Sequence, residues 1–223
     1  MTNFIESMDI IPMTATSASP ASINDDEDIQ ASTRDVLALL ADKPNFVSGY
    51  DGILIACFSV HTLVPELSER FGINVTGIFE ASILTALSLL RPSERWGIVT
   101  TGEFWERHLC DGVNAVLGIR GTVEHTKFAG VFSSGLTAGD FHTMSPAEVS
   151  EKLGFAARRL LMSGNVTCVV MGCGGMAGLE DIVRSAAVDV YNESKAKSLY
   201  IIDGVKAGVL QLHQTIMGGQ TFQ

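Results

Sequence analysis

The segment from Cys168 to Leu179 constrains the fold of this chain more than any other. It reads CVVMGCGGMAGL, an apolar and β-branched run that reaches a glycine, then a cysteine, then two more glycines. An apolar run of this length that ends in glycines is typical of a buried strand in a parallel sheet, followed by a turn into a helix. The pattern therefore predicts that the Cys173 thiol lies at the carboxyl end of a strand.

A second segment of the same kind lies earlier in the chain. Residues 53–59 read ILIACFS, and a helical pattern follows from about His61. Cys57 is thus also expected at the end of a strand and before a helix. Cys173 follows Cys57 by 116 positions, a spacing that matches the length of one lobe of an internally repeated protein.

The rest of the chain alternates between strand and helix patterns. We expect strands over 9–13, 53–57, 72–78, 96–102, 128–133, 168–172 and 199–202. We expect helices over 24–41, 61–70, 80–90, 103–111, 145–162 and 176–191, and after Gly204. The strand over 9–13 should be an edge strand, because Pro12 lacks a backbone N–H for the ladder. Alternation of this kind predicts an α/β fold with parallel sheets, whose binding groups gather at the carboxyl ends of the strands.

The two halves of the pattern repeat. We expect two pseudo-symmetric lobes, each a mostly parallel sheet flanked by helices, with the active site in the cleft between them. Lobe 1 covers residues 1–95 and lobe 2 residues 96–203, with a C-terminal helix over 204–223 that packs back on lobe 1. The first half has the pattern of the second half without its opening strand, so this strand is expected to be missing from lobe 1.

Composition excludes several classes of function. With a net charge of −10 and no cluster of Lys and Arg, the chain is not expected to bind nucleic acid. It has no apolar stretch of about 18 residues, so no membrane span is expected. The amino terminus lacks the basic and apolar regions of a signal peptide. Four cysteines in 223 residues are too few for a disulfide scaffold, so we expect a cytoplasmic protein with free thiols.

Two thiols that face each other across a cleft can move a proton. A thiol at the start of a helix is acidified by the helix dipole and by free backbone N–H groups. One thiolate can remove the α-proton of a carbon acid while the other thiol returns a proton from the opposite side, which inverts the stereocentre. Backbone donors at Gly174 and Gly175, and around Phe58 and Ser59, can hold the enolate that develops. This chemistry requires no metal and no organic cofactor.

Other interpretations of these residues remain open. Both cysteines can be buried structural residues, which is how we interpret Cys110 and Cys168. The sequence of residues 172–177 also fits the G-x-G-x-x-A pattern of dinucleotide-binding proteins, with Asp203 as a ribose partner. A redox pair of Cys57 and Cys173 is disfavoured, because lobes separated by a ligand keep the sulfurs too far apart to bridge.

Three polar residues near the predicted strand ends have two possible roles each. His61 follows Cys57 by four residues, and can tune that thiol or contact a substrate, or lie on a helix surface. Glu80 and Asp203 each follow a strand and open a helix, so capping is expected to be their role, with a substrate contact as the alternative. The histidines show no spacing typical of metal ligands, and no metal site is expected.

Three blocks of the sequence resemble a known family. They are Ala56–Ser59 (ACFS), Trp96–Trp105 (WGIVTTGEFW) and Met171–Leu179 (MGCGGMAGL). They are similar to blocks of the hydantoin and allantoin racemases, which belong to the aspartate/glutamate racemase superfamily. The similarity covers nearly the whole chain. It implies two pseudo-symmetric α/β lobes and cofactor-independent racemisation of a five-membered hydantoin-type ring, such as allantoin or a 5-substituted hydantoin.

The resemblance also implies roles for single residues. It assigns Cys57 and Cys173 as the paired acid and base. It assigns substrate binding to the groups after each cysteine and to one strand end, which are Phe58, Ser59, Gly174, Gly175, Met176, Thr100 and Thr101. Amino-acid racemases of the superfamily carry Asn-Thr after the first cysteine and Thr after the second. The different residues at these positions here point away from a free α-carboxylate substrate. The partners implied are a small-molecule substrate and, in a homo-oligomer, further copies of the chain.

The chain departs from the family pattern at its start. Family members usually begin with a strand that ends in an Asn-Pro-Asn-Ser/Thr turn bordering the site, and this sequence begins after it, at Met1-Thr2-Asn3. We expect the sequence to be truncated there. The alternatives are a non-catalytic or regulatory paralogue that binds a small ligand in the same cleft, and a decarboxylase or isomerase of the superfamily.

Overall fold

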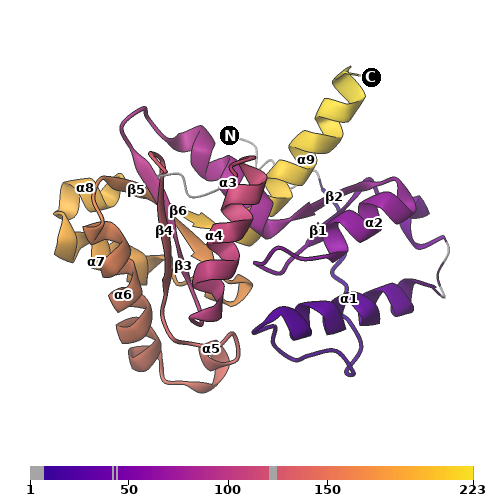
Figure 1. Ribbon diagram of the computed structural model, residues 1–223, viewed down its shortest axis with the longest axis horizontal. Helices are drawn as coiled ribbons and strands as arrows, with labels where there is room; N and C mark the ends of the chain where they lie inside the picture. Colours follow the sequence, from indigo (N-terminus) through magenta and orange to yellow (C-terminus); the bar gives the residue numbers. More distant parts are fainter. Residues whose placement is uncertain (1–7, 42, 44, 121–124, 223) are drawn as a thin grey trace.

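The protein has a mixed α/β fold with two separate parallel sheets, as the computed structural model in Figure 1 shows. The structure describes residues 8–41, 43, 45–120 and 125–222. The larger sheet has four strands in the order β4-β3-β5-β6: β3 (Arg95–Thr100), β4 (Phe128–Ser133), β5 (Val166–Gly172) and β6 (Tyr200–Asp203). The smaller sheet pairs β1 (Gly52–Ile55) with β2 (Asn74–Gly77). All the strand pairs in the described residues are parallel, as the alternation of strand and helix patterns predicts.

Helices cover both faces of the four-stranded sheet. One face packs against α6 (Pro146–Met162) and α7 (Glu180–Val190), through a cluster of buried side chains that includes Leu160, Val169 and Val183. The short helix α8 (Glu193–Lys197) follows α7. The other face packs against α3 (Ile78–Leu89) and α4 (Phe104–Val116). Strand β5 is buried along nearly its whole length because both of its faces are covered, which explains its continuous apolar sequence.

The two-stranded sheet lies between two layers of helices. Helices α1 (Asp26–Ala41) and α2 (Leu63–Phe71), with the short η2 (Phe46–Gly49), cover one face around buried Leu40, Leu63 and Leu67. The C-terminal helix α9 (Gly204–Phe222) lies on the other face, next to α3. Its Gly208 lies against Leu54 and Ile78, where a side chain would have no room. None of the helices in the described residues, α9 included, is long and apolar enough to span a membrane.

Helices α3 and α4 join the two halves of the molecule. The largest group of buried side chains gathers around them and includes Phe58, Phe79, Trp96 and Trp105, which come from both halves. Gly112 of α4 makes a close contact there: a Cβ at this position would lie 2.5 Å from Val60 Cγ2 and 2.9 Å from the Phe79 ring. The expected end of this helix at 111 is therefore too early, because Gly112 continues α4 and permits this contact.

The expected edge strand over Asp9–Met13 is wrong, because these residues form no strand in the structure. In the larger sheet the edge strand β4 bonds to β3, and β3 bonds to β5. The smaller sheet pairs only β1 with β2, and residues 9–13 join neither sheet. Their apolar side chains are exposed to solvent instead of packed in a core, among them Ile10 at 55 % and Ile11 at 63 % exposure.

Two helix predictions in the second half turn out differently. The helix over 145–162 is confirmed, and it begins with a capping box in which Ser145 and Glu148 each bond to the backbone of the other. The helix expected over 176–191 is instead divided into the 3₁₀ turn η3 (Gly174–Met176) and α7. Gly178 separates them with a φ of +86°, a left-handed conformation that glycine adopts without steric cost.

Candidate active site

The turns that carry Cys57 and Cys173 meet where the two halves of the molecule approach each other. Cys57 follows β1 by two residues, and Cys173 directly follows β5. A Cβ built on Gly174 would lie 3.4 Å from the backbone oxygen of Ala56. The residue before one cysteine is thus in close contact with the residue after the other. Both cysteines are half-buried and neither forms a disulfide.

The Cys57 thiol is strongly desolvated. Burial raises its pKa to about 11, against a lowering by the Ser59 hydroxyl and a further rise from the charge of Cys173. The Ser59 Oγ lies 3.3 Å from the Cys57 sulfur and is itself fully buried. Ionisation of Cys173 thus opposes ionisation of Cys57, because two negative charges repel each other.

The Cys173 thiol sits at the start of η3. Burial raises its pKa as well, but the backbone N–H groups of Gly175 and Met176 partly offset this effect. Cys57 has one hydroxyl neighbour, whereas Cys173 has two fixed backbone donors. Such donors stabilise a thiolate because they already point at the charge that forms. Cys173 therefore carries the better stabilised thiolate of the two.

The position of Cys173 depends on the sheet beneath it. The Thr100 hydroxyl, at the end of β3, donates a hydrogen bond of 2.9 Å to the carbonyl oxygen of Gly172. Thr100 is completely buried, and Thr101 is 5 % exposed. The expected substrate-binding hydroxyl of Thr100 is thus used to fix the turn that carries the thiol. The backbone carbonyls of Thr100 and Thr101 accept hydrogen bonds from Ser134 and Gly135, which fixes the next turn as well.

Two of the expected substrate-binding side chains lie in the core. Phe58 is 4 % exposed and packs edge-on against Phe79, with ring centres 5.5 Å apart. Met176 is fully buried in the cluster between the four-stranded sheet and helices α6 and α7. Their backbone groups are the parts of these residues that lie along the two turns. Gly174 is half-buried and Gly175 exposed, so the turn after Cys173 presents bare backbone.

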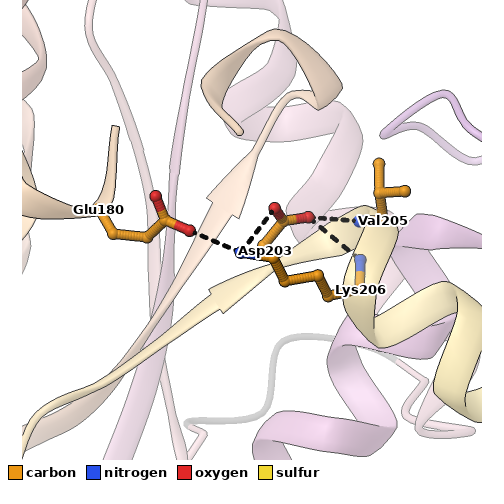
Figure 2. A network of polar contacts seen from close by, with 4 residues as sticks. All are labelled: Glu180, Asp203, Val205 and Lys206. Carbon is orange, nitrogen blue, oxygen red and sulfur yellow. Dashed lines mark hydrogen bonds and ion pairs between the residues drawn. The ribbon is translucent and has the colours of Figure 1, made fainter. Parts of the chain in front are cut away.

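Figure 2 shows a polar network that joins the starts of α7 and α9. The Asp203 carboxylate, at the end of β6, accepts hydrogen bonds from the backbone N–H groups of Val205 and Lys206, at 2.8 and 3.1 Å. The expected capping role of Asp203 is therefore confirmed for helix α9. The Lys206 ammonium lies 3.0 Å from Glu180, the first residue of α7, and 3.6 Å from Asp203. Lys206 thus links the start of α7 to the start of α9.

Glu80 lies in the first turn of α3, and its carboxylate accepts a hydrogen bond from its own backbone N–H. Its carboxylate folds back over Gly77, where only a glycine leaves room for it. The Oε2 atom is buried and has no hydrogen-bond partner, and burial raises the pKa of this carboxyl group. The bond from its own backbone N–H offsets part of this rise in pKa.

His61 is a buried residue rather than a helix-surface one, with 3 % exposure. Its Nδ1 atom accepts a hydrogen bond of 3.2 Å from the backbone N–H of Leu63, at the start of α2. Burial lowers its pKa from 6.5 to about 4, because the interior does not solvate an imidazolium. At neutral pH the imidazole is therefore uncharged and fixes the end of the Cys57 turn.

The buried His61 should make the protein less stable in mild acid. Its pKa is lower in the folded than in the unfolded chain, so stability is complete above pH 6.5 and falls as the pH decreases towards 4. Between pH 7.5 and pH 5 this one group should remove about 2 kcal/mol from the free energy of unfolding. Urea denaturation at both pH values measures this loss.

A variant isolates the contribution of His61. The substitution His61→Asn keeps a side-chain acceptor for the Leu63 N–H, since Asn readily bonds to the backbone two residues on. This variant should lose less stability than the wild type between the two pH values. His142→Asn, at an exposed position on α5 (Asp140–Thr143), is the matched control. If His61→Asn shows the same loss in acid as the wild type, the assignment is wrong.

The structure adds one residue to the site that its sequence pattern did not indicate. A Cβ on Gly175 would lie 3.1 Å from Phe141 Cδ2, 3.6 Å from the Cys173 sulfur and 3.8 Å from the backbone oxygen of Ala138. Phe141 belongs to the short helix α5, in the connection between β4 and α6. This connection has no apolar periodicity, so its sequence gives no signal that it returns to the thiol.

The described residues contain no cluster of three or more His, Cys, Asp or Glu side chains that can hold a metal ion. The polar groups around the two thiols are hydroxyls and backbone N–H groups. These are donors suited to a thiolate or an enolate oxygen.

Comparison with known proteins identifies the family. The model of the Asp/Glu/Hydantoin racemase family matches residues 6–212. The chain belongs to this family. An uncharacterized protein of Schizosaccharomyces pombe is 36 % identical over 159 residues, which are 71 % of this chain and 60 % of that protein. The chain thus spans less than two thirds of the length of this relative.

Two solved structures share the fold. Allantoin racemase from Klebsiella pneumoniae is 25 % identical with a TM-score of 0.68, over 91 % of this chain and 74 % of that one. Allantoin racemase from Pseudomonas fluorescens is 20 % identical with a TM-score of 0.70, over 95 % of this chain and 79 % of that one. The two-lobed α/β fold and the membership of the racemase superfamily, both expected from the sequence, are confirmed.

Proposed function

We propose that this protein racemises a five-membered hydantoin-type substrate, allantoin or a 5-substituted hydantoin, without a cofactor. Cys57 and Cys173 exchange the roles of base and acid on opposite faces of the ring. The observation that carries the proposal is the meeting of two strand-end turns, each with a half-buried free thiol. Family membership and the similarity to an allantoin racemase support the class of substrate.

The surroundings of the thiols suit proton transfer. Cys173, with two backbone donors, removes the α-proton of one enantiomer as the thiolate. The electron pair left on carbon passes into the adjacent ring carbonyl, and backbone N–H groups of the two turns stabilise the enolate oxygen. Cys57 is then the acid: its raised pKa keeps it protonated at neutral pH, so it can return a proton to the other face. For the other enantiomer the two thiols exchange roles.

Exchange of the α-proton in heavy water tests this function directly. We expect deuterium to enter C5 of allantoin or a 5-substituted hydantoin, with loss of optical rotation, and no exchange on free amino acids. The rate should increase from pH 7 to pH 9, because burial raises the pKa of both thiols and the thiolate fraction grows through this range. Absence of exchange on every hydantoin tested would reject a racemase and favour a non-catalytic ligand-binding protein. Release of carbon dioxide from a carboxylated substrate would instead favour a decarboxylase.

A further inference from the structure

The connection between β4 and α6 closes one side of the Cys173 turn. Its first part is firmly held: Ser134 N–H donates to the Thr100 carbonyl at 2.9 Å, and Gly135 N–H donates to the Thr101 carbonyl at 3.0 Å. Leu136, the next residue, is 1 % exposed. The connection therefore leaves the sheet from a fixed point at the end of β3, beside the end of β5.

The second part of the connection is a compact turn. The Thr137 N–H donates to the Asp140 carboxylate at 2.6 Å, and the Asp140 N–H donates to the Thr137 carbonyl at 3.2 Å. The hydrogen bonds that the Thr137 backbone N–H and side chain make to the Asp140 carboxylate lower its pKa, so the carboxylate is charged at neutral pH and holds the turn. The turn sets the direction of α5, which begins at Asp140 and places Phe141 one residue later.

The Phe141 ring and the Cys173 thiol both lie against Gly175. Phe141 and Cys173 are both half-buried, and both pack against the same cluster of buried side chains under the four-stranded sheet. The ring and the Cys173 sulfur both contact the space over Gly175, at 3.1 and 3.6 Å from where a Cβ would lie. Gly175 is exposed, so this shared space opens to the outside of the turn.

We infer that Phe141 determines which substrates fit against Cys173. Its ring forms an apolar wall beside the thiol, which accepts a flat ring with a small group and excludes a bulky one. An aromatic face also suits a planar five-membered ring, since offset or edge-on packing of flat groups is favourable. This specificity role rests on the proposed racemase function, whereas the wall itself does not.

The first experiment tests whether Phe141 limits the access of large reagents to Cys173, and it assumes nothing about the reaction. Iodoacetamide and its N-phenyl derivative react with a thiol through the same iodomethyl group, and the phenyl group makes the second reagent larger. Alkylation of Cys173 by each reagent is followed by peptide mass spectrometry. In Phe141→Ala the ratio of the rates, N-phenyl derivative over iodoacetamide, should rise about 10-fold or more at Cys173 and stay constant at Cys110. Phe141→Leu, which keeps an apolar side chain, should lie between this variant and the wild type.

The matched control is Phe155→Ala. Phe155 lies on α6 with 58 % exposure, so the same atoms are removed from the surface. This variant should keep the wild-type ratio at Cys173. Circular dichroism and the thermal transition show whether Phe141→Ala is folded. An unchanged ratio in the folded variant would show that Phe141 does not limit access to Cys173.

The second experiment tests specificity. The value of kcat/KM is compared for hydantoins with a methyl or a benzyl group at C5. Phe141→Ala should shift the preference about 10-fold or more towards the benzyl compound, whereas Phe155→Ala should not shift it. An unaltered preference would remove the specificity role. If the wild type acts on neither hydantoin and not on allantoin, the proposed function fails, and the alkylation ratio alone decides whether Phe141 limits access to Cys173.

Discussion

Replacing either Cys57 or Cys173 with serine should abolish racemisation. A positioned acid or base contributes roughly 10²–10⁴-fold to such a rate, and a serine hydroxyl is far too weakly acidic to replace a thiol at neutral pH. Cys57→Ser and Cys173→Ser should therefore each lose at least about 100-fold in racemisation measured by polarimetry. The fold should persist, because the substitution exchanges a single side-chain atom at two half-buried positions.

The two variants should differ in a way that a general loss of structure cannot reproduce. Each keeps one thiol, which reaches one face of the substrate. We therefore expect each variant to exchange the α-proton of one enantiomer with deuterium, and the two variants to prefer opposite enantiomers. Cys110→Ala, on α4, removes a half-buried thiol outside the site and should racemise like the wild type. Wild-type racemisation by both serine variants would disprove the two-thiol mechanism.

The substitution Gly172→Ala should displace the turn that carries Cys173. A Cβ there would lie 2.7 Å from Ile98 Cγ2, 3.0 Å from the Val99 carbonyl oxygen and 3.1 Å from Thr100 Cβ. The backbone of β5 must move away from β3 to accept it, and overpacking of this kind costs about 1–3 kcal/mol. Cys173 is the next residue, and a shift of a reacting group by about 1 Å can reduce a rate about 100-fold. Gly172→Ala should therefore lose both stability and α-proton exchange.

Urea denaturation and the heavy-water exchange assay measure the two effects of Gly172→Ala. The matched control is Gly218→Ala on α9, where an added Cβ would have no neighbour within 4 Å. This substitution should leave exchange unchanged and stability equal or slightly higher, since alanine favours a helix more than glycine. If Gly172→Ala retains wild-type stability and exchange, the close packing under the Cys173 turn does not hold in solution.

The periodicity of the sequence predicted most of the secondary structure. Buried parallel strands such as β3 and β5 are continuous apolar runs, and Ser145 with Glu148 marks a helix start, because these features act locally. The predictions that are wrong depend on distant residues. Residues 9–13 have a strand-like sequence but pair with no strand and leave their apolar side chains exposed, and α4 continues through Gly112, which packs closely against Val60 and Phe79.

The candidate site was also only partly predictable from the sequence. The two strand-end cysteines, the glycines that follow Cys173 and the capping aspartate Asp203 could be recognised from their order along the chain. The use of the Thr100 hydroxyl to hold Gly172 could not, since that bond joins residues 72 positions apart. For His61 the sequence allowed either a place near the Cys57 thiol or one on a helix surface, and only the structure shows it to be buried and uncharged.

The sequence by itself determined that this chain has two strand-end thiols in a repeated α/β pattern, because strand and turn signals are read over a few neighbouring residues. Only the tertiary structure decided how those thiols are surrounded. Desolvation, the contact between Ala56 and Gly174, and the wall formed by Phe141 arise from segments that lie far apart along the chain. Such contacts depend on how the two sheets pack around α3 and α4, and no local pattern encodes that packing.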